Sequence, residues 1–159
     1  MNTPLDVLHI LDPVSEGYNS LRSWILPGLM QTLQVNRTNE YPQRIFEIGS
    51  VFTKDPHAHA LADESVLLAV VLSHKNASYT EAMQVLDYLL RMLHVEYTVI
   101  DDDVGCFLKG RCARIVLKNG FKIAYVGEMH PHVLENFGIE MPVVGFELNL
   151  TELFTVVER

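Results

Sequence analysis

The chain has 159 residues, of which 48% are hydrophobic and 20% charged, a composition typical of one ordinary folded domain. A core of the size possible at this length needs neither disulfides nor a structural metal. The formal net charge of -8 argues against binding nucleic acid through the overall electrostatic field. No apolar run approaches the roughly 18 residues of a membrane span, and the start lacks the pattern of a signal peptide. The two cysteines have no metal-binding spacing, which favours a reducing, cytoplasmic setting.

Near the start, residues 7–11 form a short apolar run followed by Asp12-Pro13, which predicts a strand and a turn. Apolar residues then recur at four-residue spacing from Leu21 to Leu33, the period of a helix, but Pro27 interrupts them. We therefore expect a short helical turn up to Leu26 and a helix that begins at Pro27 and ends near Val35.

Two strands are predicted next. Residues 44–53 carry apolar side chains on both faces, which predicts a strand covered on both sides. Residues 55–63 read as an exposed connection. Residues 65–73 are almost continuously apolar, and their length and polar boundaries favour a buried strand over a helix.

Residues 80–94 give the clearest helical pattern in the sequence. Thr80 is a suitable cap, and Asp87 and Arg91 are spaced for an ion pair on the exposed side. The expected apolar stripe consists of Ala82, Val85, Leu86, Leu89, Leu90 and Leu93.

The last part of the chain predicts a strand at residues 97–100, a hairpin, a short helix at 131–137 and a strand at 143–150. The hairpin joins residues 111–117 to 121–127 through Lys118-Asn119-Gly120, because Asn-Gly between two apolar runs is a strong turn signal. This order of elements predicts an α+β fold in which three helices flank a mostly antiparallel sheet.

Residues that could bind a metal or act in catalysis occur without convincing partners. His57 with His59, and His130 with His132, lack a completing ligand at a recognised spacing. The acidic residues 101–103 lack the spacing of a calcium loop, and a solvated charge run is the simpler interpretation. Nothing near Cys106 supports a nucleophile, and buried cysteines such as Cys112 are usually inert.

The sequence contains neither GxGxxG nor GxxxxGK[ST], so the common sequence motifs of dinucleotide-binding and P-loop sites are absent. A basic cluster around the predicted hairpin leaves an RNA-contacting surface open as an alternative. On a strand Arg114 and Lys118 would share a face. The cluster consists of Lys109, Arg111, Arg114, Lys118 and Lys122.

Four segments, in order, resemble the C-terminal catalytic-like domain of the phenylalanyl-tRNA synthetase beta subunit of the archaeal and eukaryotic type. They read LRSWILPGLMQTLQVNR from Leu21, PQRIFEIGSVF from Pro42, FLKGRCARI from Phe107 and GEMHPHVLENFGIEMPVVGFELNL from Gly127. The resemblance implies a single domain at residues 1–159, with the class II aminoacyl-tRNA synthetase fold, that is part of a longer beta chain. It also implies an (αβ)₂ ligase that uses ATP and Mg²⁺ through its alpha subunit, with no active site and no cofactor in this domain.

The residues themselves show whether the features of a class II active site are present. Class II catalysis needs an arginine on the second-motif strand to hold the ATP α-phosphate. Here the residue after Phe46 is Glu47, which would repel phosphate, and strand alternation places Arg44 on the face of Phe46. In the third motif, glycines and an arginine are replaced by Glu147-Leu148-Asn149-Leu150, and we expect Glu147 and Leu148 to fill space that a nucleotide needs.

The sequence therefore predicts a non-catalytic assembly domain that contacts the alpha subunit and the rest of the beta chain in the cytoplasm, reaches tRNA only through the whole complex, and touches no membrane. The expected subunit contacts are exposed Trp24, Leu26, Leu29 and Met30, and an ordinary helix core is an equally weighted interpretation of the same residues. A free-standing paralogue that binds a small molecule or an amino acid in the remodelled pocket is the alternative function.

Overall fold

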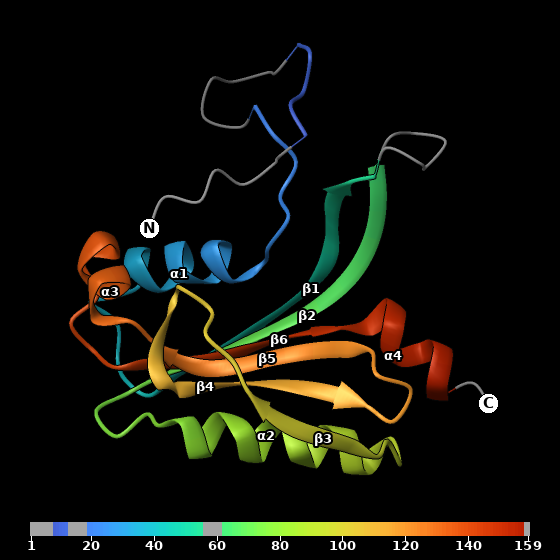
Figure 1. Ribbon diagram of the computed structural model, residues 1–159. Coiled ribbons are helices and arrows are strands. Elements are labelled where there is room, and N and C mark those ends of the chain that lie inside the picture. The colour runs from blue at the N-terminus through green and yellow to red at the C-terminus, as the bar shows by residue number, and fades with distance from the viewer. Residues whose placement is uncertain (1–7, 13–18, 56–61, 158–159) are drawn as a thin grey trace.

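The computed structural model describes residues 8–12, 19–55 and 62–157, and its centre is a six-stranded sheet with helices on both faces (Figure 1). The strand order is β1-β2-β6-β5-β4-β3, and every pairing is antiparallel. The predicted α+β fold with an antiparallel sheet is confirmed. The strands are β1 (Gln43–Lys54), β2 (Ala62–Ser73), β3 (Tyr97–Asp101), β4 (Phe107–Leu117), β5 (Lys122–Met129) and β6 (Val143–Asn149).

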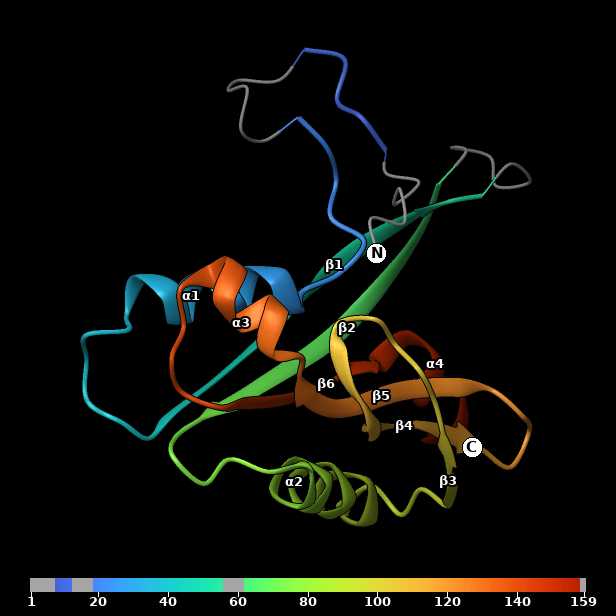
Figure 2. The same ribbon diagram turned by 60° about the vertical axis from the view of Figure 1, so that its left-hand side comes forward.

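Four helices lie in the described part of the chain: α1 (Leu26–Val35), α2 (Tyr79–Met92), α3 (Pro131–Phe137) and α4 (Leu150–Val157). Helices α1 and α3 lie on one face of the sheet and α2 on the other, as both views show (Figures 1 and 2). The sequence predicted three helices and missed α4, whose eight residues follow the last strand without a break. None of these helices is both long and apolar enough to cross a membrane.

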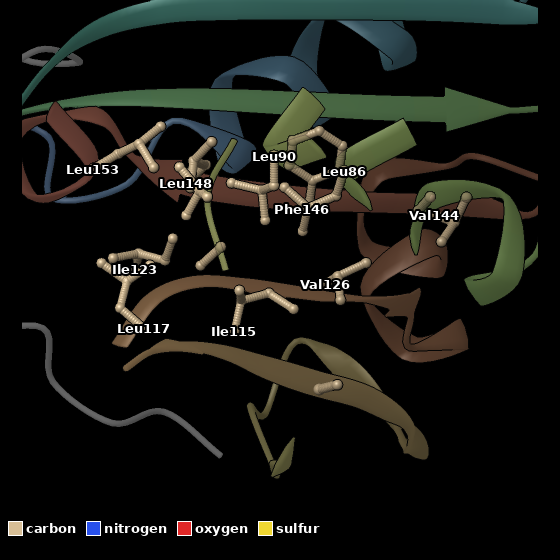
Figure 3. Close-up of a cluster of buried hydrophobic side chains, with 14 of the residues drawn as sticks. Leu86, Leu90, Ile115, Leu117, Ile123, Val126, Val144, Phe146, Leu148 and Leu153 are labelled. Atoms are coloured by element: carbon tan, nitrogen blue, oxygen red, sulfur yellow. The ribbon is translucent and has the colours of Figure 1, made fainter. Parts of the chain in front are cut away.

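The sheet separates two hydrophobic cores. On the α2 face, Leu86, Leu90 and the α4 residue Leu153 pack on strand side chains such as Phe146 and Ile115 (Figure 3). On the other face, α1 packs on β2 and on the end of β6. At roughly 1.5–3 kcal/mol for each large side chain that is fully buried, these two layers hold the helices to the sheet far more strongly than helix propensity does.

Several elements follow local signals closely. The short helix at Pro131–Phe137 has the predicted bounds, because proline suits its first turn and Gly138 ends it in the left-handed region. The hairpin between β4 and β5 is confirmed, and Gly120 adopts φ +87 in its turn. In α2 the Asp87–Arg91 pair is confirmed at 2.9 Å, whereas the cap position is Ser78 and not Thr80.

The strand predicted at residues 44–53 is β1, but its expected cover on both faces is wrong. Phe46 is 70% exposed and Ile48 is 56% exposed. The reason is topological, because β1 is an edge strand and α2 does not extend over its outer side. The buried strand predicted at 65–73 is confirmed as part of β2, which extends back to Ala62. Of the connection predicted at 55–63, residues 56–61 lie outside the described part, and Asp63 belongs to β2.

The segment before α1 also differs from the prediction. No helical turn precedes Leu26, and Pro27 is the second residue of the helix. Instead, Arg22 runs beside β1, where its carbonyl oxygen accepts from the Phe52 N–H at 2.9 Å. The strand predicted at 7–11 is reduced to one isolated bridge between His9 and Ser20, and its first residue lies outside the described part.

Candidate functional site

A cleft of about 340 Å³ opens on the α1 face of the sheet. It lies between the β1–β2 hairpin, the segment before α1, and strands β4, β5 and β6. Its polar lining has both signs of charge, from Arg114 and Lys122 on one side and from Asp63, Glu147 and Glu152 on the other. Trp24, Val51 and Leu67 supply apolar walls. The surroundings therefore fit a small polar molecule better than a purely apolar one.

Glu147 of β6 forms the most constrained contact of this cleft. Its side chain is 3% exposed, and its Oε2 accepts from the backbone N–H groups of Ile25 and Leu26, both at 3.0 Å. Those amides belong to the start of α1, where Ile25 provides no side-chain cap of its own. A carboxylate from the sheet thus caps a helix 122 residues earlier in the chain. Burial raises the pKa of the Glu147 carboxyl.

Aromatic rings and one guanidinium form the wall beside Glu147. Tyr125 lies with its ring centroid 5.8 Å from those of Trp24 and Phe107, and the Arg114 guanidinium carbon is 5.1 Å from the Tyr125 ring centroid. Burial, with the Glu147 carboxylate nearby, raises the pKa of the Tyr125 hydroxyl. That hydroxyl is buried beside the Glu147 carboxyl. Arg114 Nε donates to Asp102 Oδ2 at 2.6 Å, and this bond lowers the pKa of Asp102.

Glu47 of β1 is held by a second arginine. Arg22 Nη1 lies 2.5 Å from Glu47 Oε1, and Arg22 Nε donates to the Ser50 carbonyl at 3.0 Å. The guanidinium lies so close over Gly49 that a Cβ there would come within 2.1 Å of Arg22 Nη2. Any side chain at this position would displace the arginine. The Glu47 carboxylate is therefore paired within the chain.

Two arginines on the side of the sheet that carries the cleft form ion pairs within the chain. Arg22 pairs with Glu47, and Arg114 pairs with Asp102. Lys122 is the cleft cation that forms no ion pair with another described residue. A bound nucleoside triphosphate needs several positively charged groups around its phosphates. Within the described residues the cleft has one cationic side chain without an ion pair, Lys122, and it lies in the same cleft as the carboxyl groups of Asp63, Glu147 and Glu152.

Strand alternation was predicted correctly for Arg44. It lies on the α2 face with Phe46, 61% exposed, with Nη2 3.6 Å from Glu81 Oε1. The sheet separates it from the cleft. The expectation for Leu148 is wrong, because its side chain is buried in the α2-face core and not in the cleft (Figure 3). Glu147 lines the cleft.

Three of the four residues expected at a subunit interface are not exposed. Leu26, Leu29 and Met30 are 2–4% exposed and belong to the core between α1 and the sheet. For these three residues the interpretation as helix core is the right one, because their face of α1 is turned toward β2 and β6. Trp24 keeps partial exposure beside Pro27 and α3. For Trp24 the subunit contact stays a prediction.

The remaining candidates have ordinary structural roles. His130 Nδ1 accepts from the His132 N–H at 3.1 Å at the start of α3, and His57 and His59 lie outside the described residues. No group of three metal-ligating side chains forms within residues 8–12, 19–55 and 62–157. Burial raises the pKa of both thiols, that of Cys106 to about 12, so neither is a thiolate near neutral pH.

Four of the five residues in the basic cluster around the hairpin pair with carboxylates, and Lys122 is the exception among the described residues. Arg111 pairs with Glu128 at 3.1 Å, Lys109 with Asp103 at 3.9 Å, and Lys118 with Glu96. Lys118 lies in the turn, away from the Arg114 that was expected to share its face. This arrangement weakens the case for an RNA surface, since phosphate would have to displace these carboxylates.

Sequence reasoning missed the partners of Glu47 and Glu147. The Arg22–Glu47 pair spans 25 residues, and the contact of Glu147 with α1 spans 122. Neither separation produces a local pattern. The one available signal was the glutamate inside the otherwise apolar strand VVGFELN, because a buried carboxylate requires a partner.

Comparison with known proteins supports the same family as the motifs do. The family model described as the phenylalanyl tRNA synthetase beta chain CLM domain matches residues 2–150. Similar relatives named as phenylalanine-tRNA ligase beta subunits occur in Thermococcus sibiricus, with 41% identity over 155 residues, and in Pyrococcus abyssi, with 42% over 155 residues. Each comparison covers 97% of this chain and 28% of the relative. A relative from Methanococcoides burtonii is 39% identical over 147 residues, 92% of this chain and 26% of its own length. The chain thus spans little more than a quarter of these relatives, and it belongs to the family of phenylalanyl-tRNA synthetase beta chain CLM domains.

Proposed function

We propose that this chain is a non-catalytic assembly domain of a phenylalanine-tRNA ligase beta subunit. In this role it supports an alpha subunit that attaches phenylalanine to tRNA with ATP and Mg²⁺ in the cytoplasm. It forms one domain with the class II synthetase fold, joined to the rest of a beta chain, and tRNA meets it only as part of the whole complex. The domain itself binds no cofactor.

The observation that carries the proposal is that Glu147 in the cleft, and Glu47 on β1, are both used to hold the fold together. Glu147 caps α1, and Arg22 closes on Glu47 over Gly49. An adenylation site would need these positions to meet phosphate with positive charge, because charge develops on the transferring oxygens. Here two of them present carboxylates whose partners come from the same chain. The cleft face therefore serves to fix α1, and α1 supports the surface that includes Trp24.

The proposed contact surface lies where α1 meets α3. Trp24, Pro27, Val133 and Phe137 surround a small apolar depression there, and aromatic anchors of this kind are enriched where subunits meet. Trp24 is accessible and is packed from behind by Tyr125. A ring fixed in this way loses little side-chain entropy on binding.

Co-expression with the phenylalanine-tRNA ligase alpha subunit of the same organism tests the assembly role. We expect the two chains to co-purify, and Trp24→Ala to reduce the recovered alpha subunit at least about fivefold, because buried aromatic anchors dominate interface energies. Phe121→Ala is the matched control, since Phe121 is an exposed aromatic in the β4–β5 turn that does not line the depression beside Trp24. Equal recovery with both variants would reject Trp24 as the contact.

The absence of catalysis has its own assay. The purified chain, incubated with phenylalanine, ATP and labelled pyrophosphate, should give exchange no faster than the buffer blank. Exchange that is abolished by Glu147→Gln would place chemistry in the cleft and would contradict the proposal.

A second candidate function uses the cleft as a binding site for an amino acid. Its mixed charges favour this reading, because a zwitterion could place its carboxylate by Lys122 and its ammonium by Glu152. Calorimetry with phenylalanine, and separately with ATP, distinguishes the two functions. Binding of phenylalanine that is lost in Lys122→Ala favours the second candidate, and no heat with either compound leaves the assembly role.

A further inference from the structure

The segment that leads into α1 forms a strap across the sheet. Residues 22–26 are attached to the edge strand β1 by Arg22, whose carbonyl oxygen accepts from the Phe52 N–H at 2.9 Å. They are attached to β6 by Glu147, which accepts from two backbone N–H groups at the start of α1, both at 3.0 Å. Strand β2 lies between β1 and β6, so the strap bridges two strands that are not neighbours.

The charges at the two attachments are balanced differently. The Arg22 guanidinium forms an ion pair with Glu47 on β1. Glu147 is 3% exposed, and none of the ion pairs found among the described residues includes it. The bonds that it accepts from α1 come from neutral amides. A buried carboxylate without a cation carries a desolvation cost that hydrogen bonds return only in part, and protonation removes that cost.

The groups around Glu147 do not supply the missing cation. Tyr125 lies opposite it on β5, with its hydroxyl beside the carboxyl, and Ala69 lies opposite it on β2. The other titratable or charged groups near it are Arg22, the Cys106 thiol, and the cleft residues Asp63, Glu152, Arg114 and Lys122. Both arginines pair with other carboxylates. Burial therefore has the largest effect and raises the pKa of the Glu147 carboxyl.

We infer that residues 22–26 form a latch, which the neutral Glu147 carboxyl holds shut and which opens locally when this carboxyl is ionised. Opening admits water to the charge and frees the start of α1 from β6. The attachment at Arg22 keeps the strap on β1, so the movement is a local hinge. Trp24 lies within this segment and packs on Tyr125, with ring centroids 5.8 Å apart, so its surroundings change with the latch. Any effect on an alpha subunit rests on the proposed function, whereas the latch is a property of this chain alone.

The direction of the pH dependence follows from the two states of Glu147. In the open strap the carboxyl is hydrated and titrates near its ordinary pKa of 4.5, and in the closed strap its pKa is higher. As the pH rises between these two values, the opening constant increases about tenfold for each pH unit, and above the higher value the increase stops. Acid therefore favours the closed latch, and a rise toward neutral pH favours opening.

Hydrogen exchange of the purified chain from pH 5 to pH 8, corrected for the intrinsic rate at each pH, tests the latch. Protection of the Ile25 and Leu26 amides should fall at least about threefold over this range in the parent protein. It should stay constant in Glu147→Gln, whose side chain does not titrate. Glu152→Gln is the matched control and should keep the fall, because it removes a carboxyl of the same cleft to which neither amide donates.

The fluorescence of Trp24 gives a second measurement, since it is the one tryptophan of the chain. Its emission should change with the same midpoint as the amide protection, and this change should be missing in Glu147→Gln. Protection or emission that does not depend on pH in the parent protein overturns the inference, and so does an equal change in Glu147→Gln. Exchange of the Ile25 and Leu26 amides only as slowly as the Leu86 amide of the α2 core also overturns it, because opening would then be global unfolding. These measurements need no alpha subunit, so failure of the latch is distinguishable from failure of the assembly role.

Discussion

The contact between Glu147 and the start of α1 can be tested by removing its carboxyl group. Glu147→Leu keeps an apolar volume at the site but leaves the Ile25 and Leu26 amides without their acceptor. Each orphaned buried donor costs about 1–3 kcal/mol, and removal of a buried carboxylate returns part of that cost. We expect a net loss of about 3 kcal/mol in the free energy of unfolding, which is a large share of the 5–15 kcal/mol typical of a domain.

Glu147→Gln is the matched control, because its amide oxygen can still accept both hydrogen bonds. It should stay within about 1 kcal/mol of the parent protein at neutral pH. Urea unfolding followed by circular dichroism gives both values, and the melting temperature of Glu147→Leu should fall by about 6–12 °C. A Leu variant as stable as the Gln variant would refute the role of the carboxyl as the cap of α1.

The raised pKa of Glu147 adds a dependence on pH with a definite sign. The folded state holds the proton more tightly than the unfolded state, in which the carboxyl has its ordinary value of 4.5. The protonated carboxyl therefore favours folding below this value, and that contribution is lost as the pH rises through the raised pKa. Glu147→Gln does not titrate, so the stability of the parent protein relative to this variant should decrease from pH 4 to pH 7. An increase would contradict burial as the dominant influence on this group.

Three further predictions concern other parts of the fold. Gly145→Ala should cost about 2 kcal/mol in urea unfolding, because a Cβ there would lie 2.6 Å from the Val70 carbonyl oxygen, whereas Gly105→Ala, with open space around its Cβ, should be nearly neutral. The native thiols should react slowly with iodoacetamide at pH 8, since burial raises the pKa of Cys106 to about 12, and rapid labelling before unfolding would contradict this. Burial and the bond to Asp87 raise the pKa of Tyr97 to about 12, so in ultraviolet titration one tyrosine transition present in the parent protein above pH 11 should be missing in Tyr97→Phe.

Signals that act over a few residues predicted a large part of this fold. Asn119-Gly120 determined the hairpin because a turn of this kind needs the left-handed backbone that glycine allows. Pro131 and Gly138 bounded α3 for similar reasons, through the fixed φ of proline and the left-handed cap. The apolar stripe of α2 indicated its buried face, although the Val85 side chain of that stripe is exposed and does not belong to the core.

The sequence by itself also determined that two positions singled out by the resemblance carry carboxylates, because Glu47 and Glu147 can be read directly. Only the tertiary structure decided what these carboxylates do. Their partners, Arg22 and the amides at the start of α1, lie 25 and 121–122 residues away, and no periodic pattern reaches that far. The same holds for β1, whose apolar pattern predicts burial on both faces. Burial depends on which elements lie beside a strand, and that is set by the order of strands in the sheet, which leaves Phe46 and Ile48 at an open edge.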